Sequence, residues 1–312
     1  MTISVSVVMT VFNGESFLDI SVPSVLAQTR RDFEFVIVDD GSTDRSLEIL
    51  RRYAASDSRI VLIEGGKRGL AAASNLGIER ARGDLILRFD CDDVMLPSRL
   101  ERQSAFMTEH PEISASCGYA HLTDRSGRRV GCSKPKFDVT RGWKERNASY
   151  MLELIHPASA FRKIDFNAIG GYSEIGSLIC DRDLWAKFIL GGFQIAIQPE
   201  FLIEQSLHSA SIMVNKVRHL ELVARLIDEN LFRKRDGQPE LTCDQFLAMR
   251  KRRSLIRKVL EWRYDTAKIY YRAATRRYAE RDWVGFISHA GIGVALSPIA
   301  VPRRMLAKGM AR

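Results

Sequence analysis

Three groups of aspartates offer carboxylate chemistry in this chain: Asp39 with Asp40, Asp90 with Asp92 and Asp93, and Asp181 with Asp183. The first two groups each directly follow a short apolar run, at residues 35–38 and 85–89. Paired carboxylates at the end of a buried strand oppose folding, because like charges repel and resist desolvation. Such groups are typical of sites that hold a cation or a hydrogen-bonding ligand, and open α/β sheets bind ligands at the carboxyl ends of their strands.

The second group, Asp90-Cys91-Asp92-Asp93, supplies hard oxygen ligands, which suit Mg²⁺ or Mn²⁺ better than zinc or copper. An ion held there could neutralise a nucleotide diphosphate and make it a better leaving group. The alternative is a solvated acidic turn, since an Asp-x-Asp triplet is common by chance. Its position after an apolar strand favours a metal site with Asp90, Asp92 and Asp93 as ligands.

The first strand also ends in short polar residues, Thr10 and Asn13, which we expect at the same ligand-binding edge of the sheet as Asp39 and Asp40. A carboxylate such as Asp40 can accept a hydrogen bond from a pyrimidine ring N–H or from ribose hydroxyls, and Gly41 lets the backbone approach closely. The alternative is a turn followed by a helix cap, which accounts for Asp44. It explains the adjacent pair Asp39–Asp40 less well.

Strand and helix patterns alternate in the first part of the chain. Strands are expected at residues 4–9, 33–38, 59–64 and 85–89, with helices at 15–28, after Asp44 and at 70–81. This order predicts an α/β fold with a doubly wound, mostly parallel sheet.

Later segments follow less regular patterns. We expect a helix from Pro97 to about His110, a hairpin formed by 113–122 and 129–132, and a loop over 133–149. A helix is expected at 181–190, and the chain beyond Asn215 is expected to be helical.

Composition limits the class of protein. The 312 residues, 46% of them hydrophobic, suffice for one α/β domain of roughly 200–250 residues and an appendage. Five scattered cysteines without a CxxC motif favour reduced thiols and a cytoplasmic protein. The sequence has no evident signal peptide and no apolar stretch as long as a membrane span.

The net charge of +9 is unevenly distributed. Residues 250–312 contain 16 Lys and Arg against four acidic residues, so the rest of the chain is slightly acidic. Apolar residues recur among these cations at helical spacing. The segment could pack on the body of the protein with a solvated basic face, or it could dock on an anionic membrane surface as a peripheral protein of the inner face. Nucleic-acid binding is disfavoured, since no motif for it accompanies the charge.

Six motifs together resemble those of family 2 glycosyltransferases, in their order and spacing. They lie at residues 7–13, 37–44, 69–75, 83–93, 170–172 and 180–185. The resemblance covers roughly residues 3–212 and implies a GT-A-type nucleotide-sugar-binding fold. It therefore predicts a glycosyltransferase domain over 1–212 and a basic helical C-terminal extension over 213–312.

The resemblance also implies roles for single residues. Asp40 would contact the uracil or ribose of a UDP-sugar, in a nucleotide site with Thr10, Phe12, Asn13 and Asn75. Asp90 and Asp92 would engage the ribose and the metal, with Asp93 as a further ligand. Asp181 would be the catalytic base that takes the proton of the acceptor hydroxyl.

The sequence departs from the family pattern at two positions. Cys180 stands where the family usually has Glu, and Ser74 stands where it often has Arg. That Arg typically contacts the donor phosphates, and Lys67 or Arg68 could take its place. Of two histidines in family-like segments, His208 is a candidate metal or phosphate ligand, whereas His156 is expected to be structural.

The residues alone predict a metal-assisted nucleotide site. The resemblance implies a metal-dependent, inverting glycosyltransferase that moves a sugar from a UDP-sugar to a glycan or lipid-linked acceptor in cell-surface polysaccharide synthesis. A catalytically inactive scaffold or membrane-docking module is the main alternative. A nucleotidyltransferase is disfavoured because residues 11–15 lack a Gly-rich, basic signature. A glycosidase would need two carboxylates but no nucleotide or metal pair.

Overall fold

The computed structural model describes residues 4–173, 179–207, 217–298, 301–302 and 305. The chain divides into two compact units. The first consists of Met1–Ala120 and Lys134–Gln205, and the second of His121–Ser133 and Ser206–Arg312. Each unit is described by itself below.

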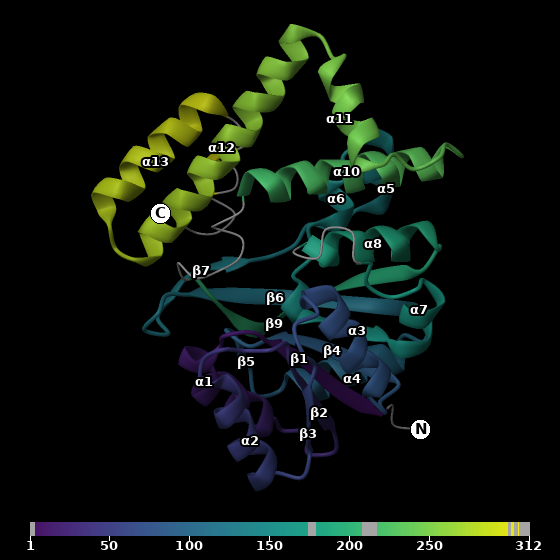
Figure 1. Cartoon of the computed structure of the whole chain (residues 1–312), viewed down its shortest axis with the longest axis vertical. Coiled ribbons are helices and arrows are strands. Elements are labelled where there is room, and N and C mark those ends of the chain that lie inside the picture. The colour runs from purple at the N-terminus through teal and green to yellow at the C-terminus, as the bar shows by residue number, and fades with distance from the viewer. Residues whose placement is uncertain (1–3, 174–178, 208–216, 299–300, 303–304, 306–312) are drawn as a thin grey trace. The chain divides into compact units, whose positions relative to one another are not determined.

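Four parallel strands form the half of the sheet that follows the N-terminus (Figure 1). They are β1 (Val5–Val11), β2 (Glu34–Asp39), β3 (Ile60–Glu64) and β4 (Leu85–Asp90), in the order β3-β2-β1-β4. The connecting helices are α1 (Glu15–Leu26), α2 (Ser46–Ser56) and α3 (Leu70–Arg80). Every residue of β1 and β2 is buried, as expected for parallel strands with both faces covered. The predicted α/β, doubly wound sheet is confirmed.

The register of these strands places the acidic groups at one edge. Thr10 near the end of β1 pairs with Val38 on one side and with Asp90 on the other. Asp39 pairs with Val11. The first two aspartate groups therefore follow the carboxyl ends of strands that flank β1.

The sheet continues with antiparallel strands, so it is mixed rather than wholly parallel. The further strands are β5 (Val94–Met95), β6 (Ile113–Thr123), β7 (Arg129–Ser133), β8 (Ser159–Arg162) and β9 (Gln194–Ser206). The order runs β4-β8-β6-β9-β5, and β7 pairs with β6. The predicted hairpin is confirmed, and its turn is held by Asp124, whose carboxylate accepts from the backbone N–H groups of Ser126 and Arg128.

The remaining helices of the first unit are α4 (Arg99–Glu109), α5 (Val139–Glu145), α6 (Ser149–Leu152), η1 (His156–Ala158), α7 (Lys163–Ala168) and α8 (Cys180–Leu190). The expected loop over 133–149 is wrong, because α5 lies within it and α6 begins at its end. The Asp138 side chain caps α5 by accepting from the Arg141 N–H at 2.8 Å. A side chain at Gly142 would collide with Met151, so Gly142 permits the two short helices to pack closely.

The second unit is mainly helical, as predicted. It contains α10 (Val217–Arg235), α11 (Cys243–Lys251), α12 (Leu255–Ala279) and α13 (Trp283–Leu296). Figure 1 shows α12 and α13 side by side. Their shared core includes Ala267, Tyr271, Ala274 and Ala290. None of the helices within the described residues is long and apolar enough to cross a membrane.

Candidate active site

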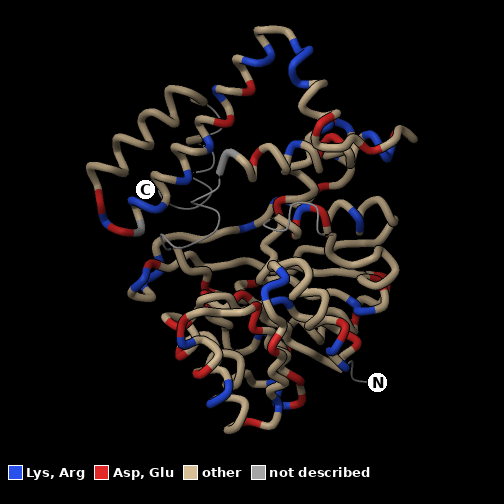
Figure 2. Tube along the Cα trace, viewed as in Figure 1, with Lys and Arg blue, Asp and Glu red and all other residues tan. Residues whose placement is uncertain are grey.

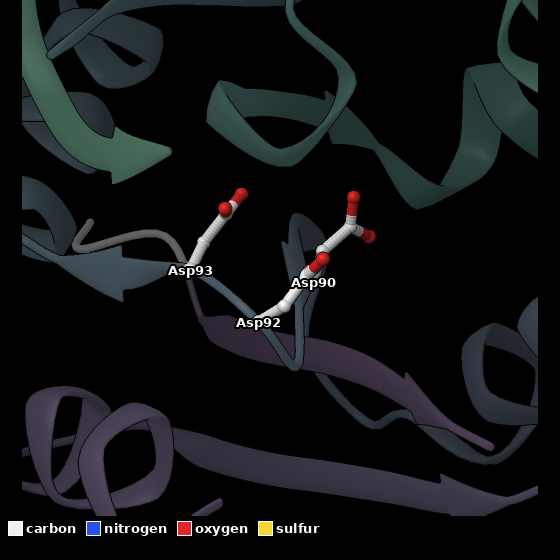
Figure 3. A group of neighbouring side chains, drawn as sticks. All are labelled: Asp90, Asp92 and Asp93. Carbon is white, nitrogen blue, oxygen red and sulfur yellow. The ribbon is translucent and has the colours of Figure 1, made fainter. Parts of the chain in front are cut away.

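The turn after β4 gathers three carboxylates. Asp90 is the last residue of β4, and the Asp93 N–H donates to the Asp90 carbonyl at 3.3 Å, which closes the turn. One carboxylate oxygen from each of Asp90, Asp92 and Asp93 lies within 4.8 Å of the others. Figure 3 shows the side chains of Asp90 and Asp93 directed to the same side of the turn. Sequence reasoning predicted these three residues as one cluster, and the structure brings them together.

Two fully buried arginines lie behind this cluster. Arg88, two residues before Asp90 on the same face of β4, donates to the Val8 carbonyl at 2.8 Å and lies 3.4 Å from the Asp90 carboxylate. Arg99 donates to the Arg88 carbonyl at 2.8 Å and to the Ser159 carbonyl at 3.1 Å. Arg99 therefore holds the backbone of β4 just before the acidic turn, and Arg88 lies beside the first carboxylate of that turn.

The surroundings of Asp90 make its ionisation unusually difficult. Burial, together with the charges of Asp92 and Asp181, raises the pKa of Asp90 to about 6, although the charges of Arg88 and Arg99 act in the opposite direction. Asp181 is thus close enough to act electrostatically on Asp90.

The donor set of the cluster fits a hard divalent cation. Its ligand atoms are carboxylate oxygens, and Asp93 is buried. Burial and the neighbouring aspartates raise the pKa of the Cys91 thiol well above the ordinary value, so without a metal this thiol is neutral. The three carboxylates suit Mg²⁺ or Mn²⁺. The other predicted ligand, His208, lies outside the described residues.

Asp181 occupies the first turn of α8. Burial raises the pKa of its carboxyl above the ordinary value, although the backbone N–H of Arg182 lowers it. Its neighbour Cys180 is buried, and burial raises the pKa of that thiol to about 12, so Cys180 stays neutral. Asp183 instead accepts from the Ser173 hydroxyl and pairs with Lys187 at 3.3 Å. Asp183 therefore stabilises the local fold, whereas the charge of Asp181 raises the pKa of Asp90.

The loops after β1 and β2 are joined by side-chain hydrogen bonds. Asn13 has φ of 54°, and its side-chain oxygen accepts from the Thr43 N–H at 2.8 Å. The Gly14 N–H donates to Ser46 Oγ at 2.8 Å, and the Glu15 N–H donates to Asp44 at 3.1 Å. These contacts fix the edge at which the predicted nucleotide-binding residues lie.

The predicted nucleotide-binding residues differ in their contacts. Both oxygens of Asp40 accept backbone hydrogen bonds, from Arg68 at 2.7 Å and Gly69 at 2.9 Å. Asp39 accepts from Gly41 and Ser42, each at 3.2 Å, as a turn residue does.

Two other residues at this edge have side-chain atoms that could contact a ligand. Phe12 is 50% exposed. Thr10 Oγ1 is buried and has no hydrogen-bond partner among the described residues. A buried hydroxyl without a partner is costly unless a ligand supplies one.

Comparison with known proteins decides the family. The sequence profile of glycosyl transferase family 2 matches residues 6–168, more than half of the chain. The chain belongs to this family. An uncharacterized glycosyltransferase of Methanocaldococcus jannaschii is 28% identical over 223 residues, which is 70% of this chain and 76% of that protein. Membership decides against the nucleotidyltransferase and glycosidase alternatives.

Two solved structures confirm the GT-A fold of this family 2 glycosyltransferase. Staphylococcus aureus TarS 1–349, in complex with UDP-GlcNAc, superposes with a TM-score of 0.58 at 16% identity, over 94% of this chain and 91% of that chain. The mannosyltransferase PcManGT from Pyrobaculum calidifontis, in complex with GDP-Man and Mn²⁺, superposes with a TM-score of 0.59 at 17% identity, over 99% and 84%.

Asn75 of this family 2 glycosyltransferase makes contacts that the sequence did not suggest. Its amide donates to the Tyr172 carbonyl at 2.8 Å and accepts from the Tyr172 N–H at 3.0 Å. A side chain at Gly171, where φ is +63°, would lie 2.9 Å from Asn75 Oδ1. The structure thus shows Asn75 tying α3 to the turn at 170–172, and its predicted contact with the nucleotide stays a prediction.

His156 is structural, as predicted. It is buried, and its Nε2 lies 2.6 Å from the Tyr172 hydroxyl. Burial lowers the pKa of His156 well below the ordinary value, and the charge of Arg88 adds to this effect. The histidine therefore stays neutral and packs edge-on against Tyr172 and Trp185.

Arg88 is the residue of this site that sequence reasoning missed, since it counted Arg88 within an apolar run. We expect Arg88→Met to weaken Mn²⁺ binding by about 10- to 100-fold, because groups that orient metal ligands contribute on that scale. Isothermal titration with Mn²⁺ measures the effect, and Arg88→Lys, which keeps a charge, should recover part of the affinity. Wild-type affinity in Arg88→Met would show that Arg88 supports the fold alone.

Proposed function

We propose that this chain is an inverting glycosyltransferase that moves a hexosyl or N-acetylhexosaminyl group from a UDP-sugar to a hydroxyl group of a glycan or lipid-linked acceptor, in the synthesis of cell-surface polysaccharide. The observation that carries the proposal is the group of three carboxylates after β4, Asp90, Asp92 and Asp93, whose ligand oxygens lie within 4.8 Å of one another. The charge of Asp181 acts on Asp90, which makes Asp181 the candidate base. A base and a metal-binding cluster in one site are what this reaction requires. The solved complexes of TarS with UDP-GlcNAc and of PcManGT with GDP-Man and Mn²⁺ support a nucleotide-sugar donor.

In the proposed reaction, Asp181 accepts the proton of the acceptor hydroxyl as its oxygen attacks the anomeric carbon. A carbon–oxygen bond forms there, the bond to the donor diphosphate breaks, and the electron pair leaves with UDP. A base that is harder to ionise holds a proton more strongly, so the raised pKa of Asp181 favours this transfer. A divalent ion held by Asp90, Asp92 and Asp93 would supply positive charge for the leaving diphosphate.

The donor nucleotide can be identified without knowledge of the acceptor. We expect UDP with Mn²⁺ to raise the melting temperature more than GDP, CDP or dTDP with Mn²⁺ do, and UDP alone to raise it less. Differential scanning fluorimetry measures each shift. Equal stabilisation by all four nucleotides, or by UDP regardless of metal, would contradict the proposed donor site.

The metal contribution should depend on pH. Asp90 has an ordinary pKa of 3.8 but one of about 6 in the folded protein, so between these values the folded state binds more protons than the unfolded state. Ionisation of Asp90 therefore lowers folding stability as pH rises through this window, and a bound cation relieves that cost. We expect Mn²⁺ to raise the melting temperature more near pH 7.5 than near pH 5. A shift that is larger at the lower pH would contradict the assignment of Asp90 as a ligand.

A further inference from the structure

The first turns of α12 expose a group of large apolar side chains. Each is at least 46% exposed, and none contributes to the core that α12 and α13 share. They are Leu255, Ile256, Val259, Leu260 and Trp262. At 3.6 residues per turn they cover an arc of roughly 160° of the helix surface. An apolar arc of this width is what a helix buries against another surface.

Exposed cations accompany this arc. They are Lys251, Arg252, Arg257, Lys258 and Arg263. Lys258 and Arg257 lie on either side of the apolar arc by helical geometry, and Arg263 lies within it at its C-terminal end. Figure 2 marks Lys and Arg along the connection between α11 and α12 and into α12.

The only acidic residue of segment 251–263 is neutralised inside the second unit. Glu261 is 12% exposed and pairs with Arg253, with Arg250 at 3.2 Å and with Arg257 at 3.6 Å. Ser254 accepts from the Arg257 N–H at 3.4 Å and so caps the start of α12. The segment is therefore a capped helix start that presents positive charge and apolar surface together.

The cations nearer the C-terminus of α12 have a different use. Lys268 donates to Glu221 of α10 at 2.8 Å, and Arg272 pairs with the same carboxylate at 2.9 Å. Arg225 of α10 pairs with Asp265. These partly buried pairs join α10 to α12, whereas five of the six cations of segment 251–263, all except Arg253, are exposed.

We propose that segment 251–263 docks on an anionic phospholipid surface, with the five apolar side chains inserted at the level of the headgroups and the flanking cations on the lipid phosphates. Charge complementarity selects this occupant, because long basic side chains beside an apolar helix arc can extend to the phosphates while their stems stay in apolar surroundings. Each Lys or Arg near such a surface strengthens binding by about fivefold. The proposal does not depend on catalysis.

Flotation of the full-length chain with vesicles tests the proposal. We expect the protein to float with phosphatidylcholine vesicles that contain about 30% phosphatidylglycerol, and less so with pure phosphatidylcholine or at high salt. Lys258→Gln with Arg263→Gln should weaken partitioning by about 25-fold. Ile256→Asn with Leu260→Asn should weaken it at least about tenfold.

A matched control separates this surface from exposed apolar residues in general. Ile20 and Ile164 of the first unit are 63% and 75% exposed, close to the exposure of Leu260 and Ile256. Ile20→Asn with Ile164→Asn should leave vesicle binding unchanged. Brominated lipids should quench the fluorescence of the wild type more than that of Trp262→Phe, since Trp262 lies in the inserted arc.

Several results would overturn the proposal. Failure of the wild type to float with anionic vesicles would overturn it. Binding by both α12 variants as strong as that of the wild type would overturn it too. Sedimentation that shows a dimer lost in Ile256→Asn with Leu260→Asn, without vesicle binding, would assign the surface to a second copy of the chain. A lower melting temperature of that variant, again without vesicle binding, would assign it to packing within the protein.

Discussion

Replacing Asp181 with asparagine should lower kcat by about 10²- to 10⁴-fold while leaving the affinity for UDP and Mn²⁺ nearly unchanged. Asparagine keeps the size of the side chain but has no basic carboxylate, so it cannot accept the proton of the acceptor hydroxyl. Binding should survive because Asp181 is a base in the proposed reaction and not a metal ligand. Release of UDP from a UDP-sugar measures turnover, and isothermal titration with UDP and Mn²⁺ measures binding.

The control for this variant is Asp183→Asn, which changes a carboxylate of the same helical turn. Asp183 is engaged by Ser173 and Lys187, so its replacement should affect stability more than turnover. Transfer by Asp181→Asn at the wild-type rate would show that another group is the base. UDP binding by the wild type without turnover on any acceptor would instead favour an inactive scaffold.

Replacing Asp92 with alanine should abolish the metal-dependent part of UDP binding, with a loss in affinity of at least about tenfold. Asp92 is partly exposed, and its charge raises the pKa of Asp90, so it lies where a cation would relieve repulsion. Removing one of the three clustered carboxylates takes away one hard oxygen ligand and one negative charge, so the ion is held more weakly. Titration of UDP at fixed Mn²⁺, compared with titration in the presence of a chelator, measures how much Mn²⁺ contributes to the affinity for UDP.

Asp84→Ala is the matched control for this experiment. Asp84 lies just before the other end of β4 and accepts from the Ser4 hydroxyl at 2.6 Å, so it shares the strand but not the site. The control should bind UDP and Mn²⁺ as the wild type does. If Asp92→Ala also kept the full effect of Mn²⁺ on UDP binding, the metal would have to bind elsewhere.

The parallel half of the sheet could be predicted because its sequence signal is local. Continuous apolar runs such as 35–38 end in Asp or Gly and alternate with helical spacing, which is enough to specify strand, helix and order. The antiparallel half gave a weaker signal. The two short helices between residues 139 and 152 depend on an Asp138 cap and on close packing at Gly142. Neither feature appears in the sequence as apolar residues at helical spacing, so the helices were not predicted.

The acidic residues of the site could be predicted by type, but their partners could not. Asn75 and Tyr172 are 97 residues apart in sequence, and no local pattern indicates that they bond. Arg88 has the position of a strand residue, and its role emerges only from the register that sets it beside Val8 and from its alignment with Asp90. Polar contacts between distant segments are set by tertiary structure, which sequence periodicity does not encode.

The boundary between the two units shows the same limit. Residues 121–133 belong to the second unit, because Leu122 and Val130 of the hairpin cluster with Leu207 and Tyr278. The predicted boundary divides the chain once, after residue 212. A single boundary cannot group the hairpin at 121–133 with residues that come much later in the sequence. The predicted assignment of 1–212 as the catalytic domain remains a proposal about function.

The central claim is that the carboxylates after β4 and at the start of α8 serve one reaction on a metal-bound UDP-sugar. The most direct measurement is an anomalous-difference map from crystals soaked with UDP and Mn²⁺. We expect one manganese peak at metal–ligand distance from carboxylate oxygens of the Asp90–Asp93 turn, bridged to the UDP diphosphate, with the uracil near Asp40. A manganese peak elsewhere, or UDP bound in this site without manganese, would contradict the account.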